Sequence, residues 1–477
     1  MKEKHPGGAA RPSLTRLPLA AALAAALLMA AGCRVMNRAA TKSFYFDRQY
    51  GRITSGTELQ RSAFVFTEDH LEDAALEGVA EAGSVEVHYQ GGLELEARRL
   101  AGYMDAIIAA AQEQTGFEIL YGLRLYLLRV DVLPQKVRFR VTTDHAERFY
   151  SAPVFVEAGA RRRDGALFFP AHPFHMLHEL VELSLVKTDG PYRVAPDLGW
   201  GPFRIVNGTR WFREGYASYL GFVGAEFARE ELGLDMYYDH LQWGNEGVRP
   251  LMRLVAGGRG LFRWHQFSPR SRDDMHYDGS LGLFLLMRHR FGEDTIREIA
   301  AELSGLDRPD GRSLREMVRQ VTGEDPVEMV EDLRFPQTGL SLVQLSPAEA
   351  ESNGLGARTL VVVVETAEGS PAAAAGLVEG DILVAANHRP VKTFFDIEYA
   401  IIESMESGEI LLSVERRGAV SNMAVSLEGA RALTRDHFRR IAAKDDAPAR
   451  WTWRGSVWVR LESPSRRTTR DQIEDRQ

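Results

Sequence analysis

Residues 175–182 place four polar side chains on one face of a helix, and this pattern restricts the possible folds more than any other segment. At about 100° per residue, His175, His178, Glu179 and Glu182 fall within roughly 100° of arc, with apolar residues between them. His178 and Glu182 stand at i and i+4, one turn apart on that face. Taken alone, the segment favours the polar face of an ordinary amphipathic helix over a metal site.

The composition is that of an ordinary globular protein. A length of 477 residues favours two or three domains, and contents of 45% hydrophobic and 26% charged residues are typical of folded chains. The formal net charge of -8 gives no reason to expect a nucleic-acid partner. The one basic run, at 161–163, is followed by Asp164 and is interpreted as a solvated loop.

Residues 1–33 predict an export signal that ends in a lipidated cysteine. A basic start precedes an apolar Leu and Ala stretch at 17–29, which is too short for an ordinary membrane-spanning helix. Small residues then lead into Cys33, the only cysteine, which excludes an intramolecular disulfide and a cysteine-based zinc site. The segment resembles a bacterial lipobox, with Ala30 in place of the usual Leu. The alternative is a plain secretory signal cleaved just before Cys33.

The lipobox resemblance implies a location. A lipidated Cys33 would hold the protein stably at a membrane surface. Because Arg34 rather than Asp follows the cysteine, the resemblance implies the outer membrane of a Gram-negative cell envelope, with the protein on the periplasmic side.

The rest of the chain divides by pattern into four parts. We expect an α+β body at 85–335, in which alternating apolar runs predict strands and a 3.6-residue period predicts helices. A tether with a few short elements at 34–84 precedes this body, a glycine-rich domain at 336–429 follows it, and a strand-like piece with a charged tail fills 430–477. In the body, the predicted strands are 85–89, 123–130, 137–142 and 165–169, and the predicted helices are 93–114, 175–182, 211–227, 281–290, 294–303, 314–321 and 326–333.

The part at 336–429 resembles a PDZ domain of the bacterial protease type. A pure strand pattern at 360–364 precedes the segment 370–377, which reads S-P-A-A-A-A-G-L, and Gly380 and Asp381 follow it. Gly376 permits a left-handed stop of the short helix, and Gly-Asp is turn chemistry.

This resemblance implies a small β-sandwich or barrel with a peptide groove. PDZ domains bind the C-terminal end of a polypeptide as an added strand and hold its carboxylate with backbone amides. The loop that would hold the carboxylate is formed by Gly339, Leu340, Ser341 and Leu342. The alternative is a domain that only braces the body.

A second segment, 211–219, changes the interpretation of the polar helix. It reads W-x-x-E-G-x-A-x-Y, and together with the H-E pair at 178–179 it resembles the gluzincin metallopeptidases of the aminopeptidase N and glycyl aminopeptidase type. The resemblance covers about residues 85–430 in order, including the trailing PDZ domain. It implies a thermolysin-like catalytic body with a β-sheet subdomain and a helical subdomain.

The same resemblance implies a role for each polar residue. One Zn²⁺ would be held by three side chains, a neighbouring glutamate would act as general base, and a tyrosine would stabilise the oxyanion of the tetrahedral intermediate. The ligands would be His178, Glu182 and Glu214, with His175 as a substitute ligand or a supporting group; the base would be Glu179, and the tyrosine Tyr277.

The sequence departs from the family pattern at three places. Glu182 stands where the second zinc-binding histidine belongs, and this added negative charge would make the metal less Lewis-acidic. The lysine of the family's Y-x-K-G segment is absent from 277–280, and the strand-like run 165–169 has no acidic residue to hold a substrate's free amine. We therefore expect an endopeptidase or a degenerate site rather than an aminopeptidase.

Two classes of function follow. The first is a membrane-anchored zinc metallopeptidase that hydrolyses polypeptide substrates and binds peptides through its PDZ domain. The second is a catalytically degenerate pseudopeptidase that acts as a PDZ-mediated protein-binding lipoprotein. Retention of Glu179, Glu214 and Tyr277 favours the enzyme, whereas loss of the second histidine at position 182 favours the binder.

Overall fold

The computed structural model describes most of the chain between residues 40 and 461. The described ranges are 40–47, 52–55, 64–65, 74–130, 136–157, 173–200, 203–232, 250–268, 273–345, 350, 354–356, 358–431, 450–454 and 457–461. The predicted signal with Cys33, the predicted strand at 165–169 and the charged end after 461 lie outside them. Within the described ranges, no helix combines the length and the apolar character that crossing a bilayer requires.

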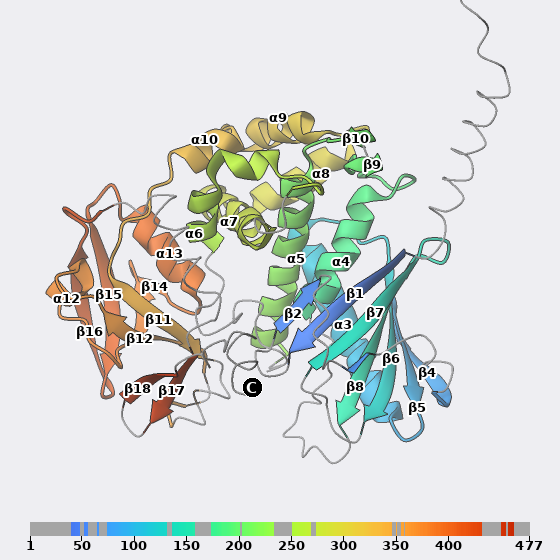
Figure 1. Cartoon of the computed structure of the whole chain (residues 1–477), viewed down its shortest axis with the longest axis horizontal. Coiled ribbons are helices and arrows are strands. Elements are labelled where there is room, and N and C mark those ends of the chain that lie inside the picture. The colour runs from blue at the N-terminus through green and yellow to red at the C-terminus, as the bar shows by residue number, and fades with distance from the viewer. Residues whose placement is uncertain are drawn as a thin grey trace, which may run out of the picture.

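The body is built on one mixed sheet with its helices packed against it (Figure 1). The strands follow the order β2-β1-β7-β8-β6-β5-β4, and β3 pairs with β7. Neighbours β5, β6 and β8 run parallel, and helix α3 (Glu94–Thr115) connects β5 to β6. The strands are β1 (Ala40–Asp47), β2 (Arg52–Ser55), β3 (Phe64–Val65), β4 (Leu76–Ala82), β5 (Val85–Gln90), β6 (Gly122–Val130), β7 (Lys136–Asp144) and β8 (Phe149–Glu157).

The spacing of apolar residues explains why helix α3 and strand β6 form and pack together. In β6 the residues Leu123, Leu125 and Leu127 are buried and alternate with partly exposed residues, as expected for a strand whose faces differ. In α3 a buried stripe that includes Leu100, Met104 and Ile107 packs toward the sheet. Gly116 ends α3 with a φ of 68°, a left-handed stop that glycine adopts readily.

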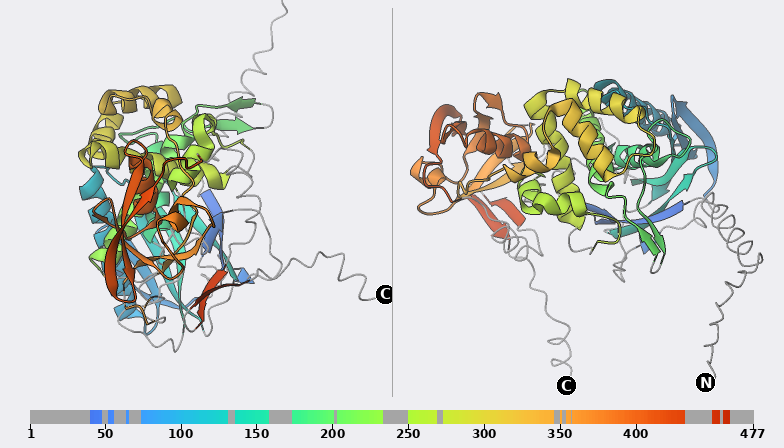
Figure 2. Two further views of the ribbon diagram at one scale, coloured as in Figure 1. Left: turned by 90° about the vertical axis from the view of Figure 1, so that its left-hand side faces the viewer. Right: turned by 90° about the horizontal axis from the view of Figure 1, so that it is seen from above.

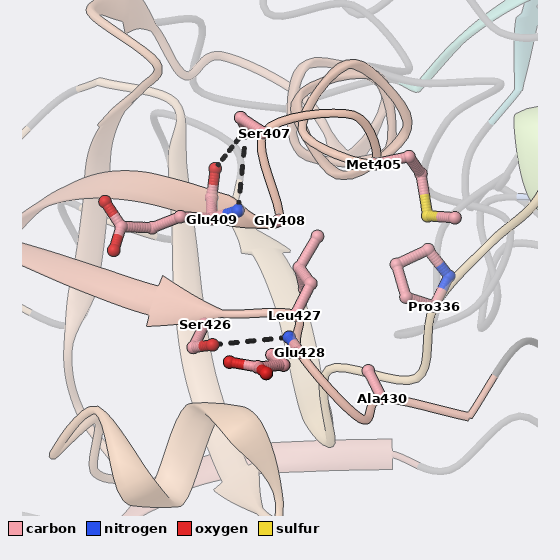
Figure 3. Close-up of a pocket in the computed structure, with 9 residues that line it drawn as sticks. All are labelled: Pro336, Met405, Ser407, Gly408, Glu409, Ser426, Leu427, Glu428 and Ala430. Atoms are coloured by element: carbon pink, nitrogen blue, oxygen red, sulfur yellow. Dashed lines mark hydrogen bonds between the residues drawn. The ribbon is translucent and has the colours of Figure 1, made fainter.

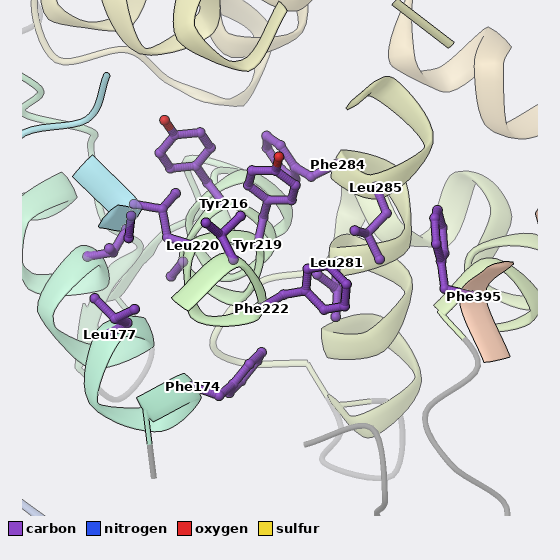
Figure 4. Packing of buried hydrophobic residues seen from close by; sticks show 14 of the residues in the cluster. Phe174, Leu177, Tyr216, Tyr219, Leu220, Phe222, Leu281, Phe284, Leu285 and Phe395 are labelled. Carbon is purple, nitrogen blue, oxygen red and sulfur yellow. The ribbon is translucent and has the colours of Figure 1, made fainter. Parts of the chain in front are cut away.

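A helical layer forms the second half of the body. It holds α4 (Pro173–Val186), α5 (Arg210–Glu230), α6 (Pro250–Gly257), the 3-10 helix η2 (Gly258–Arg263), α7 (Asp273–Phe291), α8 (Asp294–Ser304), α9 (Gly311–Thr322) and α10 (Pro326–Glu331), and a short hairpin of β9 (Leu198–Trp200) and β10 (Phe203–Ile205) lies between α4 and α5 in the chain. Helix α5 packs closely on α4, because a Cβ at Gly221 would lie 2.6 Å from the carbonyl oxygen of Phe174. Figure 4 shows Tyr216, Tyr219 and Phe222 of α5 between Leu177 of α4 and Phe284 of α7.

In its described residues, the C-terminal domain has a six-stranded sheet with helices α12 and α13, set beside the helical layer (Figures 1 and 2). The order is β11-β12-β13-β15-β16, with β14 paired to β13. Gly376 has a φ of 82°, as the predicted helix stop requires. The elements are β11 (Leu340–Leu345), β12 (Leu360–Thr366), α12 (Pro371–Ala374), β13 (Ile382–Ala386), β14 (Arg389–Pro390), α13 (Phe394–Glu403), β15 (Glu409–Arg416) and β16 (Ala419–Ser426).

The structure adds elements that were not predicted, among them β8, β9, β10, α6 and η2, and it changes others. The piece at 451–461 is a hairpin, β17 (Arg450–Arg454) with β18 (Val457–Leu461), rather than one strand. Strands β1 to β4 come from the segment predicted to be mainly a tether, and they join the sheet of the body. Helix α7 begins at Asp273, eight residues before its predicted start at 281, so Tyr277 lies inside a helix.

Candidate functional site

Helices α4 and α5 bring His178 and Glu214 together. The Nε2 atom of His178 lies 3.3 Å from Oε2 of Glu214, and both side chains are buried. Within the described residues, His178 is the partner that this Glu214 oxygen has. A buried imidazole nitrogen and a buried carboxylate oxygen therefore face each other at short range. Their role as ligands of one cation stays a prediction.

Ser218 contacts the second ring nitrogen of His178. Its Oγ lies 3.2 Å from Nδ1 of His178, on the side of the ring away from Glu214. Ser218 stands one turn after Glu214 on α5, so one face of that helix touches both nitrogens of the imidazole. Sequence reasoning missed Ser218, although its i+4 spacing from Glu214 was a signal. An Nδ1 proton donated to Ser218 would leave the Nε2 lone pair directed at the Glu214 side.

The other two residues of the H-E-x-x-E pattern lie nearby. His178, Glu179 and Glu182 each offer one ligand atom, and these atoms all lie within 4.8 Å of one another. Glu214 is outside this group of three, as is His175, whose ring makes an edge contact with Phe174 at 5.5 Å between centroids. The predicted ligands are thus clustered around His178.

Glu182 has a cationic partner that the sequence reasoning did not consider. Its Oε1 accepts a hydrogen bond of 2.5 Å from Nη2 of Arg213, and the two side chains are only 15% and 12% exposed. Arg213 precedes Glu214 on α5, so this ion pair joins α4 to α5 beside the His178–Glu214 contact. The Glu182 carboxylate is therefore neutralised by an arginine.

A second arginine, Arg210, organises the side of the site that holds Tyr277. The Tyr277 hydroxyl donates to Oε1 of Glu214 at 3.2 Å and accepts from Nη2 of Arg210 at 2.9 Å. Arg210 also donates from Nε to the same Glu214 oxygen at 3.2 Å, and its guanidinium lies 4.1 Å from the ring centroid of Trp264. The structure thus brings Tyr277 to Glu214, and Arg210 and Trp264 are additions from the structure.

The electrostatics of the pocket favour a cation at His178. Burial lowers the pKa of His178, but the carboxylate of Glu214, and at longer range those of Glu179 and Glu182, raise it above its ordinary value. The net direction means that positive charge at Nε2 is stabilised. The carboxylates around His178 therefore stabilise its imidazolium form.

The predicted carboxylate loop of the C-terminal domain lies at the start of β11. Gly339 has a φ of 76°, its carbonyl oxygen accepts from the amide of Ala367 at 2.9 Å, and a Cβ there would collide with the side chain of Ser370. Among the described strands, β11 pairs only with β12, so its other edge is not paired within that part of the chain. Helix α13 is tied to this strand, because Phe394 N donates to the Gln344 side chain at 3.2 Å.

A separate hollow of about 500 Å³ lies where the chain enters and leaves this domain (Figure 3). It is lined by Pro336, Met405, Ser407, Gly408, Glu409, Ser426, Leu427, Glu428 and Ala430. None of the predicted site residues lines it.

Comparison with known proteins establishes the C-terminal domain. Residues 336–427 match the family model described as PDZ domain. No curated protein matches the chain. The predicted PDZ domain is therefore confirmed, and the molecule is a mixed helix and sheet protein with a C-terminal PDZ domain.

Solved structures give weaker likenesses. The HtrA-type protease AlgW with a decapeptide is 23% identical at a TM-score of 0.19, over 25% of this chain, which spans only 34% of that protease. The HtrA3 PDZ domain bound to a phage-derived ligand (FGRWV) is 24% identical at a TM-score of 0.17, over 20% of this chain and 83% of that domain. An aminopeptidase N family protein from Idiomarina loihiensis is 12% identical at a TM-score of 0.34, over 83% of this chain and 74% of that protein.

Proposed function

We propose that this protein is a zinc-dependent metallopeptidase of gluzincin type that binds polypeptides through its PDZ domain and is anchored to the bacterial envelope by a lipidated Cys33. The observation that carries the metal centre is the contact between His178 and Glu214. Two ligands held about 2.0–2.2 Å from a tetrahedral zinc ion lie roughly 3.4 Å apart. The His178 and Glu214 atoms are 3.3 Å apart, which agrees with this spacing.

The donor atoms of these residues fit a metal ion, but one of the carboxylates, Glu182, is already paired with an arginine. His178 and Glu214 are placed as ligands, Ser218 fixes the imidazole, and Glu182 would supply the third ligand atom. Zinc, when bound there, would act as a Lewis acid toward the substrate carbonyl and would acidify a water molecule. Arg213 shares the Glu182 carboxylate, so this ligand would be weaker than the histidine that it replaces.

The protein's own side chains supply the proton chemistry. The Glu179 carboxylate accepts a proton from the attacking water as the water oxygen bonds to the peptide carbon, and it then gives that proton to the leaving nitrogen as the C–N bond breaks. Tyr277 donates a hydrogen bond to the oxyanion, for which its hydroxyl turns away from Glu214. Arg210 keeps the tyrosine oxygen in place during that change.

One observation favours a second candidate, the pseudopeptidase. The guanidinium groups of Arg213 and Arg210 already lie against the carboxylates of Glu182 and Glu214. Two positive charges therefore occupy the electrostatic role that a divalent cation has in a metallopeptidase. In this alternative the ion pairs hold α4 and α5 together, and peptide binding by the PDZ domain is the working activity.

Metal analysis separates the two candidates. For the peptidase we expect about one zinc per chain in the purified protein, and a weakening of zinc affinity by at least 100-fold in the His178→Ala variant, measured by calorimetric titration of the metal-free protein. A control variant, His88→Ala, changes a part-buried histidine paired with Glu86 in the sheet and should bind zinc normally. Absence of stoichiometric zinc in the native protein, together with its appearance in Glu182→His, would establish the pseudopeptidase.

Peptide binding is tested at the carboxylate loop. Gly339→Val introduces a β-branched side chain at a positive φ against Ser370, so the loop must distort. With fluorescently labelled Phe-Gly-Arg-Trp-Val as the probe, we expect binding to the native chain and at least a tenfold weaker Kd for Gly339→Val, measured by anisotropy. Gly354→Ala changes another glycine of positive φ, in open space, and controls for backbone strain. Equal binding of the C-terminally amidated probe would argue against carboxylate recognition at Gly339.

A further inference from the structure

The PDZ domain supplies the N-terminal cap of a helix in the body. Glu398 of α13 is buried, and its two carboxylate oxygens accept from the backbone amides of Leu251 at 3.0 Å and Met252 at 3.3 Å. These residues occupy the first turn of α6, which begins at Pro250. Because proline has no N–H, Leu251 and Met252 carry the first amides of that helix that need an acceptor.

This capping contact is unusual in its origin. Helix caps normally come from the residue just before the helix, whereas Glu398 follows α6 by more than 140 residues. A carboxylate at a helix N-terminus is also favoured by the helix dipole. The first turn of α6 is therefore stabilised by the position of α13, and α13 belongs to the PDZ domain.

Helix α6 is in turn locked to α7. A Cβ at Gly279 of α7 would lie 3.2 Å from the carbonyl oxygen of Arg253, and a Cβ at Gly282 would collide with the backbone of Pro250. The two helices therefore touch backbone to backbone, at the same turn of α6 that Glu398 caps. A shift of that turn cannot be absorbed by side-chain motion and must move α7.

Helix α7 carries Tyr277, and it also touches α13 directly. Tyr277 lies less than one turn before Gly279, and its hydroxyl bonds Glu214 and Arg210. Figure 4 draws Phe395 of α13 and Leu285 of α7, which belong to the same cluster of buried residues. The ring of Phe395 also meets His289, near the end of α7, edge-on at 6.3 Å between centroids.

The contacts from Glu398 to Tyr277 start at α13, and α13 is also expected to flank the peptide groove of the PDZ domain. A peptide that adds to the open edge of β11 would lie against α13, which is already joined to β11 through the hydrogen bond from Phe394 N to Gln344. Helix α13 thus has one side on the groove and another on α6 and α7.

We infer that Glu398 is a positioning residue for Tyr277, and that α13 couples the PDZ groove to the Arg210–Tyr277–Glu214 network. A peptide that moves α13 changes the cap on α6, the packing of α6 on α7, and the placement of the Tyr277 hydroxyl. The groove end of this path rests on the peptide binding proposed above, whereas the path from Glu398 to Tyr277 is independent of any metal.

Hydrogen exchange of the full chain tests the path. In Glu398→Ala, amides of α6 and of the first half of α7 are expected to exchange at least tenfold faster than in the native protein. Glu398→Gln has the same shape but keeps only one of the two acceptor oxygens, so it should restore part of the protection. Glu403→Ala changes an exposed glutamate of the same helix, paired with Arg389 at 3.3 Å, and should leave α6 and α7 unchanged.

Two results would overturn the inference. One is faster exchange confined to α13 and α6 in Glu398→Ala while α7 keeps native protection. The other is an effect of Glu403→Ala on α7 equal to that of Glu398→Ala, which would mean a general loosening of α13. Should Glu398→Ala fail to fold, Glu398→Asp takes its place, because its shorter side chain cannot keep both bonds to α6, and the same two results overturn the inference. Exchange is measured without zinc or substrate, so these outcomes are independent of whether the site hydrolyses peptides.

Discussion

Under the proposed peptidase mechanism, the Glu179→Gln variant is expected to hydrolyse peptides with a kcat lower by a factor of about 10²–10⁴ and to bind zinc as the native protein does. Glutamine has nearly the same shape as glutamate but cannot accept the proton of the attacking water. Glu179 is buried and shares a cluster with His178 and Glu182, so the substitution changes the base and leaves the other two side chains in place. Cleavage of fluorogenic casein by the zinc-loaded protein provides the measurement.

Glu113→Gln is the matched control for Glu179→Gln. Glu113→Gln removes an exposed carboxylate from α3, outside the cluster, and should hydrolyse casein at the native rate. Native activity in Glu179→Gln would remove Glu179 from the proton chemistry. Failure of the native protein to cleave any peptide when loaded with zinc would instead support the pseudopeptidase.

The Arg213→Met variant is expected to lose about 3–5 kcal/mol of the free energy of unfolding. Methionine keeps much of the apolar stem but leaves the Glu182 carboxylate without its 2.5 Å partner, 85% buried and close to Glu179. Removing one member of a buried ion pair costs more than the pair itself contributes, because the remaining charge stays desolvated. Urea denaturation of the metal-free protein measures the loss.

Two further variants serve as controls for Arg213→Met: a double variant that removes the whole buried ion pair, and a variant that breaks an exposed ion pair. Arg213→Met with Glu182→Leu replaces the whole pair by apolar groups and should recover most of the lost stability. Arg319→Met breaks the exposed pair with Glu316, also 2.5 Å long, and should have little effect because water screens that pair. A loss in Arg213→Met no larger than in Arg319→Met would show that Glu182 does not depend on Arg213.

The sequence predicted elements whose cause is local. Helix α3 and strand β6 follow from the spacing of apolar residues, which the backbone geometry alone converts into a buried face. The elements of the PDZ domain could also be predicted from the sequence, because Gly376 and the pair Gly380 and Asp381 form backbone turns that few other residues form. Strand β8 was not predicted. Its nine residues pair with β6 in parallel and with β7 in antiparallel orientation, and only the folded sheet defines these neighbours.

The polar stripe at 175–182 shows the limit of pattern reasoning. By itself, the sequence determined that His178, Glu179 and Glu182 share one helix face, because the α-helix repeats every 3.6 residues. It also singled out Glu214 and Tyr277, but only through a resemblance. Only the tertiary structure decided what these side chains meet: Arg213 for Glu182, Arg210 for Glu214, and Ser218 for His178. Those contacts depend on how closely α4, α5 and α7 approach, and that distance is decided by packing between helices rather than by spacing within one.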